Sequence, residues 1–222
     1  MMANQNQLVP LQKIAYFQEF LKNFNFFVKR SNDHWVQDLQ DYNEYLEVDD
    51  PALSPHIDSF ESRVDLYTEF KNNFPQLQRQ AYIQLIFAKF EDFMNQLCVC
   101  FESELESQIS YNDMYGSGIK RARTYLKKVI QLDFPDDIDE WNKINNINKI
   151  RDKISHAGGY IDKHNDILNI ISTSQTLNLE KYSRDEIIFS EGYLTEVVSQ
   201  FQSFIKHLQE QVVLFYSNNT IK

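Results

Sequence analysis

The side chains best able to do chemistry in this chain lie close together, at residues 148–160, with the sequence NKIRDKISHAGGY. An arginine such as Arg151 can hold a phosphate through two parallel N–H groups, and a histidine such as His156 can move protons near neutral pH. Asp152 and His156 are four residues apart, so on a helix they share a face on which the carboxylate can orient the imidazole. Together these residue types fit phosphodiester cleavage by general acid–base catalysis.

The same residues also fit a structural role at the end of a helix. Gly158 and Gly159 are typical of the position just past a helix C-terminus. Cationic side chains in the last turn of a helix interact favourably with the helix dipole, and Arg151 and Lys153 can have this role alone. His156 would then bond to a backbone carbonyl. An arginine five residues before a histidine is a weak signal, and the spacing alone does not decide between the two interpretations.

A second cluster of charge lies at residues 120–128, where Lys120, Arg121, Arg123, Lys127 and Lys128 occur without one acidic residue between them. Residues 120, 123 and 127 share one helical face, so the cluster predicts a track for RNA or, equally, a solvated helix face. The chain as a whole carries a net charge of −10, which argues against a general nucleic-acid coat protein. Its acidic residues gather at 38–69, which predicts a solvated surface, a shield for a basic groove or a contact for a basic partner.

Metal and cofactor motifs are not apparent. The chain has no glycine-rich phosphate loop, no HExxH and no paired CxxC, and its five histidines do not cluster at ligand spacing. Cys98 and Cys100 diverge on a helix, so we expect buried small apolar residues rather than a disulfide or a metal site. The start of the chain is unlike a signal peptide, and no apolar run is long enough for a membrane span. We therefore expect no metal, no cofactor and a cytoplasmic location.

Apolar residues at steps of three and four predict a series of helices. The predicted helices cover residues 11–30, 35–46, 57–74 (ended by Pro75), 76–108, 118–132, 136–157 and 191–216. Either Asp136 or Asp137 is expected to cap the sixth of these helices. Between residues 160 and 189 the pattern changes to short β-branched runs at 167–171, 176–179 and 186–189, which predict a small hairpin.

These elements predict an all-α protein, a helical bundle with a short β-hairpin inserted before the last helix. We divide the chain into an N-terminal helical extension, residues 1–75, and a helical domain, residues 76–222. The extension completes the bundle, covers a cleft or engages a partner; the sequence leaves these three roles open.

The string from Lys149 to Gly159 resembles the signature of HEPN domains, which has an arginine, a polar residue, about three further residues and a histidine, often before a glycine pair. The architecture is similar over residues 76–216, because the motif ends a late helix ahead of a final long helix. The helix that contains Phe90 and Glu91 resembles the family's earlier core helix. One difference is that Asp152 stands where asparagine is more frequent.

The resemblance implies a metal-independent endoribonuclease of bacterial phage defence or of a toxin–antitoxin system. Family members of this kind act as homodimers in which two motifs face one cleft, and an antitoxin is a further expected partner. Arg151 would contact the scissile phosphate of RNA, His156 would act as general base or acid for attack by the 2′-hydroxyl, and Asp152 would orient the site. Independently of the resemblance, Lys153 and Ser155 are candidates to assist at the phosphate; the alternative for each is a plain surface position. The alternative is a non-catalytic HEPN scaffold that binds RNA or a partner protein.

Overall fold

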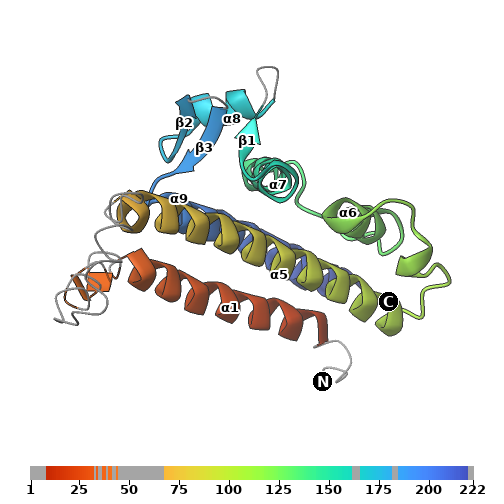
Figure 1. The fold of residues 1–222 in the computed structure, drawn as a ribbon. Helices are drawn as coiled ribbons and strands as arrows, with labels where there is room; N and C mark the ends of the chain where they lie inside the picture. Colours follow the sequence, from red (N-terminus) through yellow and green to blue (C-terminus); the bar gives the residue numbers. More distant parts are fainter. Residues whose placement is uncertain are drawn as a thin grey trace.

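The computed structural model describes residues 9–32, 68–161, 166–181 and 185–219, together with a few isolated positions between 34 and 44. The described chain is predominantly helical, with one small sheet before the last helix (Figure 1). This confirms the predicted fold class. The elements in chain order are α1 (Val9–Asn32), the π-helix η2 (Glu69–Asn73), α5 (Phe74–Glu104), the 3-10 turn η3 (Tyr111–Asp113), α6 (Gly118–Lys128), α7 (Asp139–Ala157), β1 (Tyr160–Ile161), α8 (Ile167–Thr173), β2 (Leu177–Lys181), β3 (Asp185–Phe189) and α9 (Tyr193–Asn219).

Three long helices, α1, α5 and α9, form the body of the molecule (Figure 1). Each helix buries the apolar residues that recur at three- and four-residue steps, as their periodicity predicts. The helix α1 packs against both α5 and α9. The described part of the N-terminal region is thus in contact with the bundle, while the division of the chain at residue 75 stays a prediction.

Aromatic rings fill the centre of the bundle. Phe90 is fully buried, and its ring centroid lies 4.8 Å from that of Phe201 and 5.8 Å from that of Phe204. On the side of α1, the rings of Phe17 and Phe93 stack with their centroids 4.6 Å apart. These contacts join α1, α5 and α9 through large apolar side chains, which contribute most of the hydrophobic stabilisation of such a core.

The segment between α7 and α9 forms a three-stranded antiparallel sheet in the order β1-β3-β2. The predicted hairpin is confirmed for β2 and β3, but the prediction of a strand at 167–171 is wrong, because these residues lie in the helix α8. Ile167 and Ile171 are the buried residues of α8, and their four-residue spacing places both on one helical face. The β-branched composition of this short run was the misleading signal.

A buried glutamine fastens the sheet to α5. The amide nitrogen of Gln76 donates to the carbonyl of Ile187 at 2.6 Å, and its amide oxygen accepts from the N–H of Phe189 at 3.1 Å. Gln76 thereby takes the place of a neighbouring strand along an open part of β3. The N–H of Ile187 in turn donates to the carbonyl of Gly159 at 3.1 Å, which ties β3 to the end of α7.

The predicted boundaries of three other helices need correction. Pro75 does not end a helix; it lies in the first turn of α5, and the π-helix η2 leads directly into that turn. The basic helix ends at Lys128 rather than near residue 132. The helix α7 begins at Asp139 and has no side-chain cap, so neither Asp136 nor Asp137 caps it.

Two predicted helices, at 35–46 and 57–74, lie mostly outside the described residues. The part of the second that is described contains the π-helix η2. In the described part of the chain, no helix is both long enough and apolar enough to cross a membrane.

Candidate functional site

The end of α7 carries the predicted catalytic residues, and its geometry is set by the two glycines. Gly158 has the left-handed conformation, with φ 61° and ψ 24°, and its N–H donates to the carbonyl of Ile154 at 3.0 Å. The N–H of Gly159 donates to the carbonyl of Lys153 at 3.2 Å. These two bonds satisfy carbonyls that the helix end would leave open, as the glycine pair predicts.

Arg151 lies between α7 and α5 and is held on three sides. Its Nη1 is 3.0 Å from Oδ1 of Asp152, and its Nη2 is 3.5 Å from Oε2 of Glu91 on α5. The guanidinium carbon lies 4.8 Å from the centroid of the Phe87 ring, a cation–π contact. The side chain keeps 26% of its surface exposed. The arginine fork is therefore reachable from solvent, but carboxylates occupy its two amino groups.

His156 has the opposite environment. The residue is exposed, and within the described part of the chain its side chain has no hydrogen bond or ion pair. Five residues along a helix correspond to about 140° around its axis, so Arg151 and His156 leave α7 in different directions. The contact that the four-residue spacing suggested between Asp152 and His156 is not formed, because Asp152 turns to Arg151 instead. The predicted role of Asp152 in orienting the imidazole has no contact to support it here.

A cavity of ≈ 400 Å³ lies beside Arg151, between α5 and α7. From α7 it is lined by Arg151 and Ser155, which are four residues apart and share a face, whereas His156 and Lys153 do not line it. Its α5 wall contains Gln84, Ala88, Glu91, Asp92 and Asn95. Two carboxylates against one guanidinium give the cavity a net negative charge, which opposes the approach of a phosphate.

The start of α6 packs against the carboxylate of Glu91. A Cβ atom on Gly118 would lie 3.4 Å from Oε1 of Glu91, which shows how closely the backbone approaches. Gly118 also has φ +59°, a conformation that favours glycine. Glu91 thus lies between the first turn of α6 and the guanidinium of Arg151. Neither contact has a local sequence signal, because Glu91 is 60 residues from Arg151 along the chain.

The basic cluster on α6 is largely engaged in contacts within the protein. Asp136 forms ion pairs with Arg123 and with Lys127, whose Nζ lies 2.7 Å from the nearer carboxylate oxygen. Burial alone would raise the pKa of the Asp136 carboxyl, but hydrogen bonds from Lys127 and Arg123 outweigh burial and lower this pKa. Arg121 lies over the ring of Tyr111, with 4.5 Å between its guanidinium carbon and the ring centroid. Of the predicted track, Lys120 and Lys128 are exposed and form no ion pair within the described residues.

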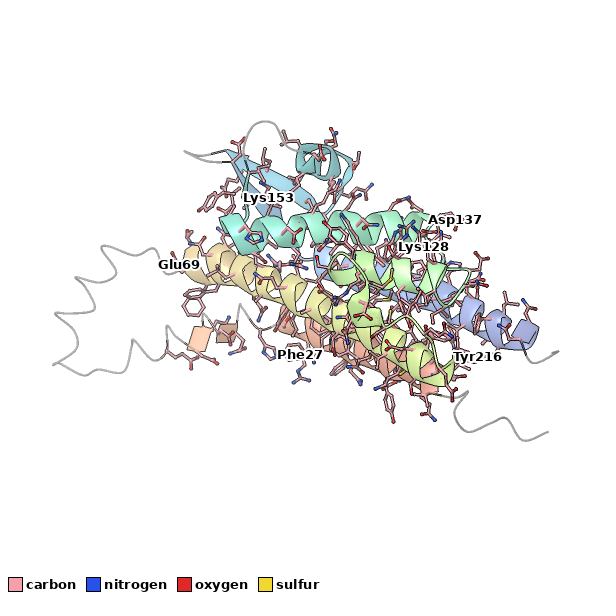
Figure 2. The ribbon with its side chains drawn as sticks, turned by 90° about the vertical axis from the view of Figure 1, so that its right-hand side faces the viewer. Phe27, Glu69, Lys128, Asp137, Lys153 and Tyr216 are labelled. Carbon is pink, nitrogen blue, oxygen red and sulfur yellow. The ribbon has the colours of Figure 1, made fainter. Side chains whose placement is uncertain are left out.

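The two predicted clusters also lie apart along the bundle. Figure 2 shows Lys153 near the sheet end of α7, while Lys128 and Asp137 lie near the start of that helix. The C-terminal half of α6 therefore does not adjoin the end of α7. A strand of RNA would have to run along α7 to contact both.

In the described residues, no three His, Cys, Asp or Glu side chains come together as a cluster that could hold a metal ion. Cys98 is buried and unpaired, and Cys100 is half-buried. The prediction of a buried cysteine is confirmed for Cys98, whereas Cys100 is not fully buried.

The chain matches no protein-family model, no curated protein and no solved structure. The HEPN resemblance therefore rests on the motif residues and on the order of the helices.

Proposed function

We propose that the end of α7 cleaves RNA as a metal-independent endoribonuclease of the HEPN type, acting as a homodimer. The observation that supports this best is His156, an exposed imidazole with no partner within the described chain, in the last turn of a helix that also carries Arg151. A histidine free of structural bonds can exchange protons with a substrate. Phage defence or a toxin–antitoxin system, with an antitoxin as a further partner, is the setting that the family resemblance suggests.

In the proposed reaction, a His156 imidazole removes the proton from the RNA 2′-hydroxyl, and the oxygen attacks the adjacent phosphorus. The 2′-oxygen–phosphorus bond forms, the bond from phosphorus to the 5′-oxygen breaks, and the His156 imidazolium returns its proton to the leaving oxygen. Arg151 neutralises charge on the phosphate in the transition state. Arg151 must first release Glu91 or Asp152, an exchange that partly exposed ion pairs allow at little cost.

A dimer would bring together groups that diverge within one chain. The outward face of α5 beside the Arg151 cavity has exposed apolar residues, with Leu77 59%, Leu85 44% and Val99 50% exposed. Ala81 and Ala88 lie on the same face and are small enough for close approach of another helix. Asp92 and Asn95 interrupt this face between Ala88 and Val99, but its apolar part at Leu77, Ala81, Leu85 and Ala88 supports association with a second copy. His156 of that copy would then meet Arg151 of the first.

The alternative is a non-catalytic scaffold that binds RNA or a partner protein. One observation favours it: the guanidinium of Arg151 is bound by Glu91 and Asp152 and lies on the ring of Phe87. These contacts would give Arg151 a purely structural role in joining α7 to α5.

The test is cleavage of labelled RNA by the purified chain in excess EDTA, with total RNA and tRNA as substrates. Arg151→Ala and His156→Ala should abolish cleavage, and the products should end in a 2′,3′-cyclic phosphate. His207→Ala is the matched control, because His207 lies on α9 and pairs with Glu210 at 3.6 Å, so this variant should keep full activity. Cleavage by either motif variant at the wild-type rate, or no cleavage of any substrate, would favour the scaffold.

Mixing the two inactive variants tests the dimer. If one site takes Arg151 from one copy and His156 from the other, a mixed dimer has one complete site. Random exchange then restores about a quarter of the wild-type activity. A mixture that stays inactive, from variants shown to exchange subunits, would contradict this division of residues between the two copies.

A further inference from the structure

The C-terminal half of α1 exposes two aromatic rings. Phe26 is 68% and Phe27 53% exposed, although phenylalanine is mostly buried in folded proteins. The ring of Phe27 contacts that of Tyr82 on α5, with centroids 5.7 Å apart, so its position is fixed by the bundle. The ring of Phe26 contacts no other ring within the described residues. Two adjacent rings that the core does not use are typical of a surface that binds a partner.

Cationic side chains surround Phe26 on the same helix. Lys22 and Arg30 are each four residues from Phe26 and Lys29 is three residues from it, so all three lie on its side of α1. All three are exposed. Lys29 and Arg30 form no ion pair within the part of the chain that the structure describes, and Lys22 lies 3.6 Å from the carboxylate of Glu19. The helix has four cationic residues and one acidic residue, whereas the whole chain carries −10.

Exposed flat rings beside unpaired cations fit a single-stranded nucleic acid. An unpaired base can stack on an exposed aromatic ring, and the phosphates on either side of that base can bind lysine and arginine. In a duplex, the base faces are covered by the neighbouring base pairs. A helix that lies in a membrane surface needs a continuous apolar face, and α1 uses its apolar face to pack against α5 and α9. The outward positions Glu19, Lys22 and Asn23 are exposed and polar, which disfavours a membrane.

We propose that this surface of α1 binds single-stranded RNA. The rings of Phe26 and Phe27 stack on bases, and Lys22, Lys29 and Arg30 bind the phosphates next to them. The proposal rests on the proposed function only for the role of the bound strand as a substrate. Binding needs no cleavage, so the two can fail separately.

The surface lies at the same end of the molecule as the proposed cleavage site. Figure 2 shows Phe27 and Lys153 toward the end of the bundle at which α5 begins, with α5 between them. Figure 1 agrees, since α1 and α7 lie on opposite sides of α5. A single strand held on α1 would therefore reach the end of α7 by passing around the start of α5.

Fluorescence anisotropy of the full chain with a labelled single strand of 2′-O-methyl RNA tests this proposal. A strand of about twelve nucleotides is within the size of single-strand sites, and its blocked 2′-oxygens prevent cleavage. Phe26→Ala should weaken binding about tenfold, because one base loses its stacking partner. Tyr115→Ala is the matched control, since Tyr115 is 99% exposed but precedes α6, so this variant should bind as the wild type does. The same strand annealed to its complement should bind more weakly.

The salt dependence of binding separates stacking from charge. Arg30→Ala should reduce the slope of the logarithm of the association constant against the logarithm of salt concentration by about 0.7, the effect of one phosphate contact on a single strand. Phe26→Ala should keep the wild-type slope, because it removes no charge. Lys206→Ala is the control for charge. Lys206 is an exposed cation on α9, so its replacement should change neither the affinity nor the slope.

The proposal is overturned if the wild type does not bind the strand at about 0.1 mM, the weak end of non-specific nucleic-acid affinity. It is also overturned if Phe26→Ala binds as tightly as the wild type, or if Arg30→Ala and Lys206→Ala reduce the slope equally. Sedimentation with vesicles of phosphatidylserine and phosphatidylcholine tests the other anionic partner. If Phe26→Ala loses vesicle binding but keeps RNA binding, the surface binds membranes and the proposal is wrong. A chain that binds the strand through α1 but cuts no RNA would support this proposal and contradict the proposed cleavage.

Discussion

Replacing Gln76 by leucine tests how the sheet is held to the bundle. The side chain of Gln76 is 9% exposed and makes two hydrogen bonds to β3, one to the carbonyl of Ile187 and one from the N–H of Phe189. Leucine has nearly the same size but can make neither bond. Both backbone groups would remain buried, because Ile187 is 0% and Phe189 1% exposed.

The expected cost follows from these two unpaired groups. Leaving one buried donor or acceptor unsatisfied costs about 1–3 kcal/mol, so Gln76→Leu, which leaves two, should lower the free energy of unfolding by about 2–6 kcal/mol. Gln84→Leu is the matched control. Gln84 is on the same helix, is exposed and has no hydrogen bond within the described residues, so its replacement should change stability by less than about 0.5 kcal/mol.

Urea unfolding followed by circular dichroism measures both variants, and hydrogen exchange locates the effect. Exchange of the Phe189 amide should accelerate in Gln76→Leu, since this amide loses its acceptor. A loss of stability below about 1 kcal/mol, or the same loss in both variants, would show that the two bonds do not hold the sheet. Because Ile187 also donates to the carbonyl of Gly159, a loosened β3 should increase exchange at the end of α7 as well.

Three further changes have defined outcomes in the same unfolding assay. Phe90→Ala should lower the free energy of unfolding by about 3–5 kcal/mol, because the fully buried ring leaves a cavity at the centre of the bundle; a loss under about 1 kcal/mol would contradict the packing. Gly158→Ala should cost about 1 kcal/mol from its φ of 61°, and an unchanged midpoint would mean that the end of α7 can rearrange. Asp136→Asn should cost about 1 kcal/mol at pH 7. The ion pairs lower the pKa of the Asp136 carboxyl in the folded state. The stability that they contribute is therefore present above the unfolded pKa and is lost as the pH falls through the folded pKa, so the variant and the wild type should be equally stable in acid. A difference in stability that persists in acid would refute the ion-pair origin.

The long helices could be predicted from sequence because each carries an uninterrupted apolar face. Ile83, Phe87, Phe90, Met94, Leu97 and Phe101 are all buried along α5, as their spacing requires, but Leu105, the last residue of the predicted row, lies just past the end of α5 and is 44% exposed. The glycine pair likewise placed the end of α7 correctly. By contrast, the run at 167–171 is too short for its period to separate a strand from a helix, and contact with α7 and β2 decides its conformation.

The contacts of the candidate site could not be predicted, because they join residues that are distant in the chain. Glu91 and Phe87 meet Arg151 only after α5 and α7 have packed together. Asp136 reaches Arg123 and Lys127 across the turn that ends α6, which removes two cations from the predicted RNA track. Charge counted along a sequence does not reveal such pairing, since a folded chain brings together charges that composition reports separately.

The different directions of Arg151 and His156 make the oligomeric state the deciding property of this protein. On one helix these side chains lie about 140° apart, and Asp152 binds only the arginine. A single chain therefore presents a guanidinium held by carboxylates on one side and an unbonded imidazole on another. The proposed cleavage requires both groups at one phosphate. If the chain is a monomer at the concentrations at which it acts, the scaffold is the better account of these residues.

If the chain forms a dimer through the exposed face of α5, Leu85→Glu should both separate the two copies and abolish cleavage. Each separated chain should stay folded, because Leu85 is 44% exposed. A monomeric Leu85→Glu variant that still cuts RNA would show that one chain suffices and would refute the composite site.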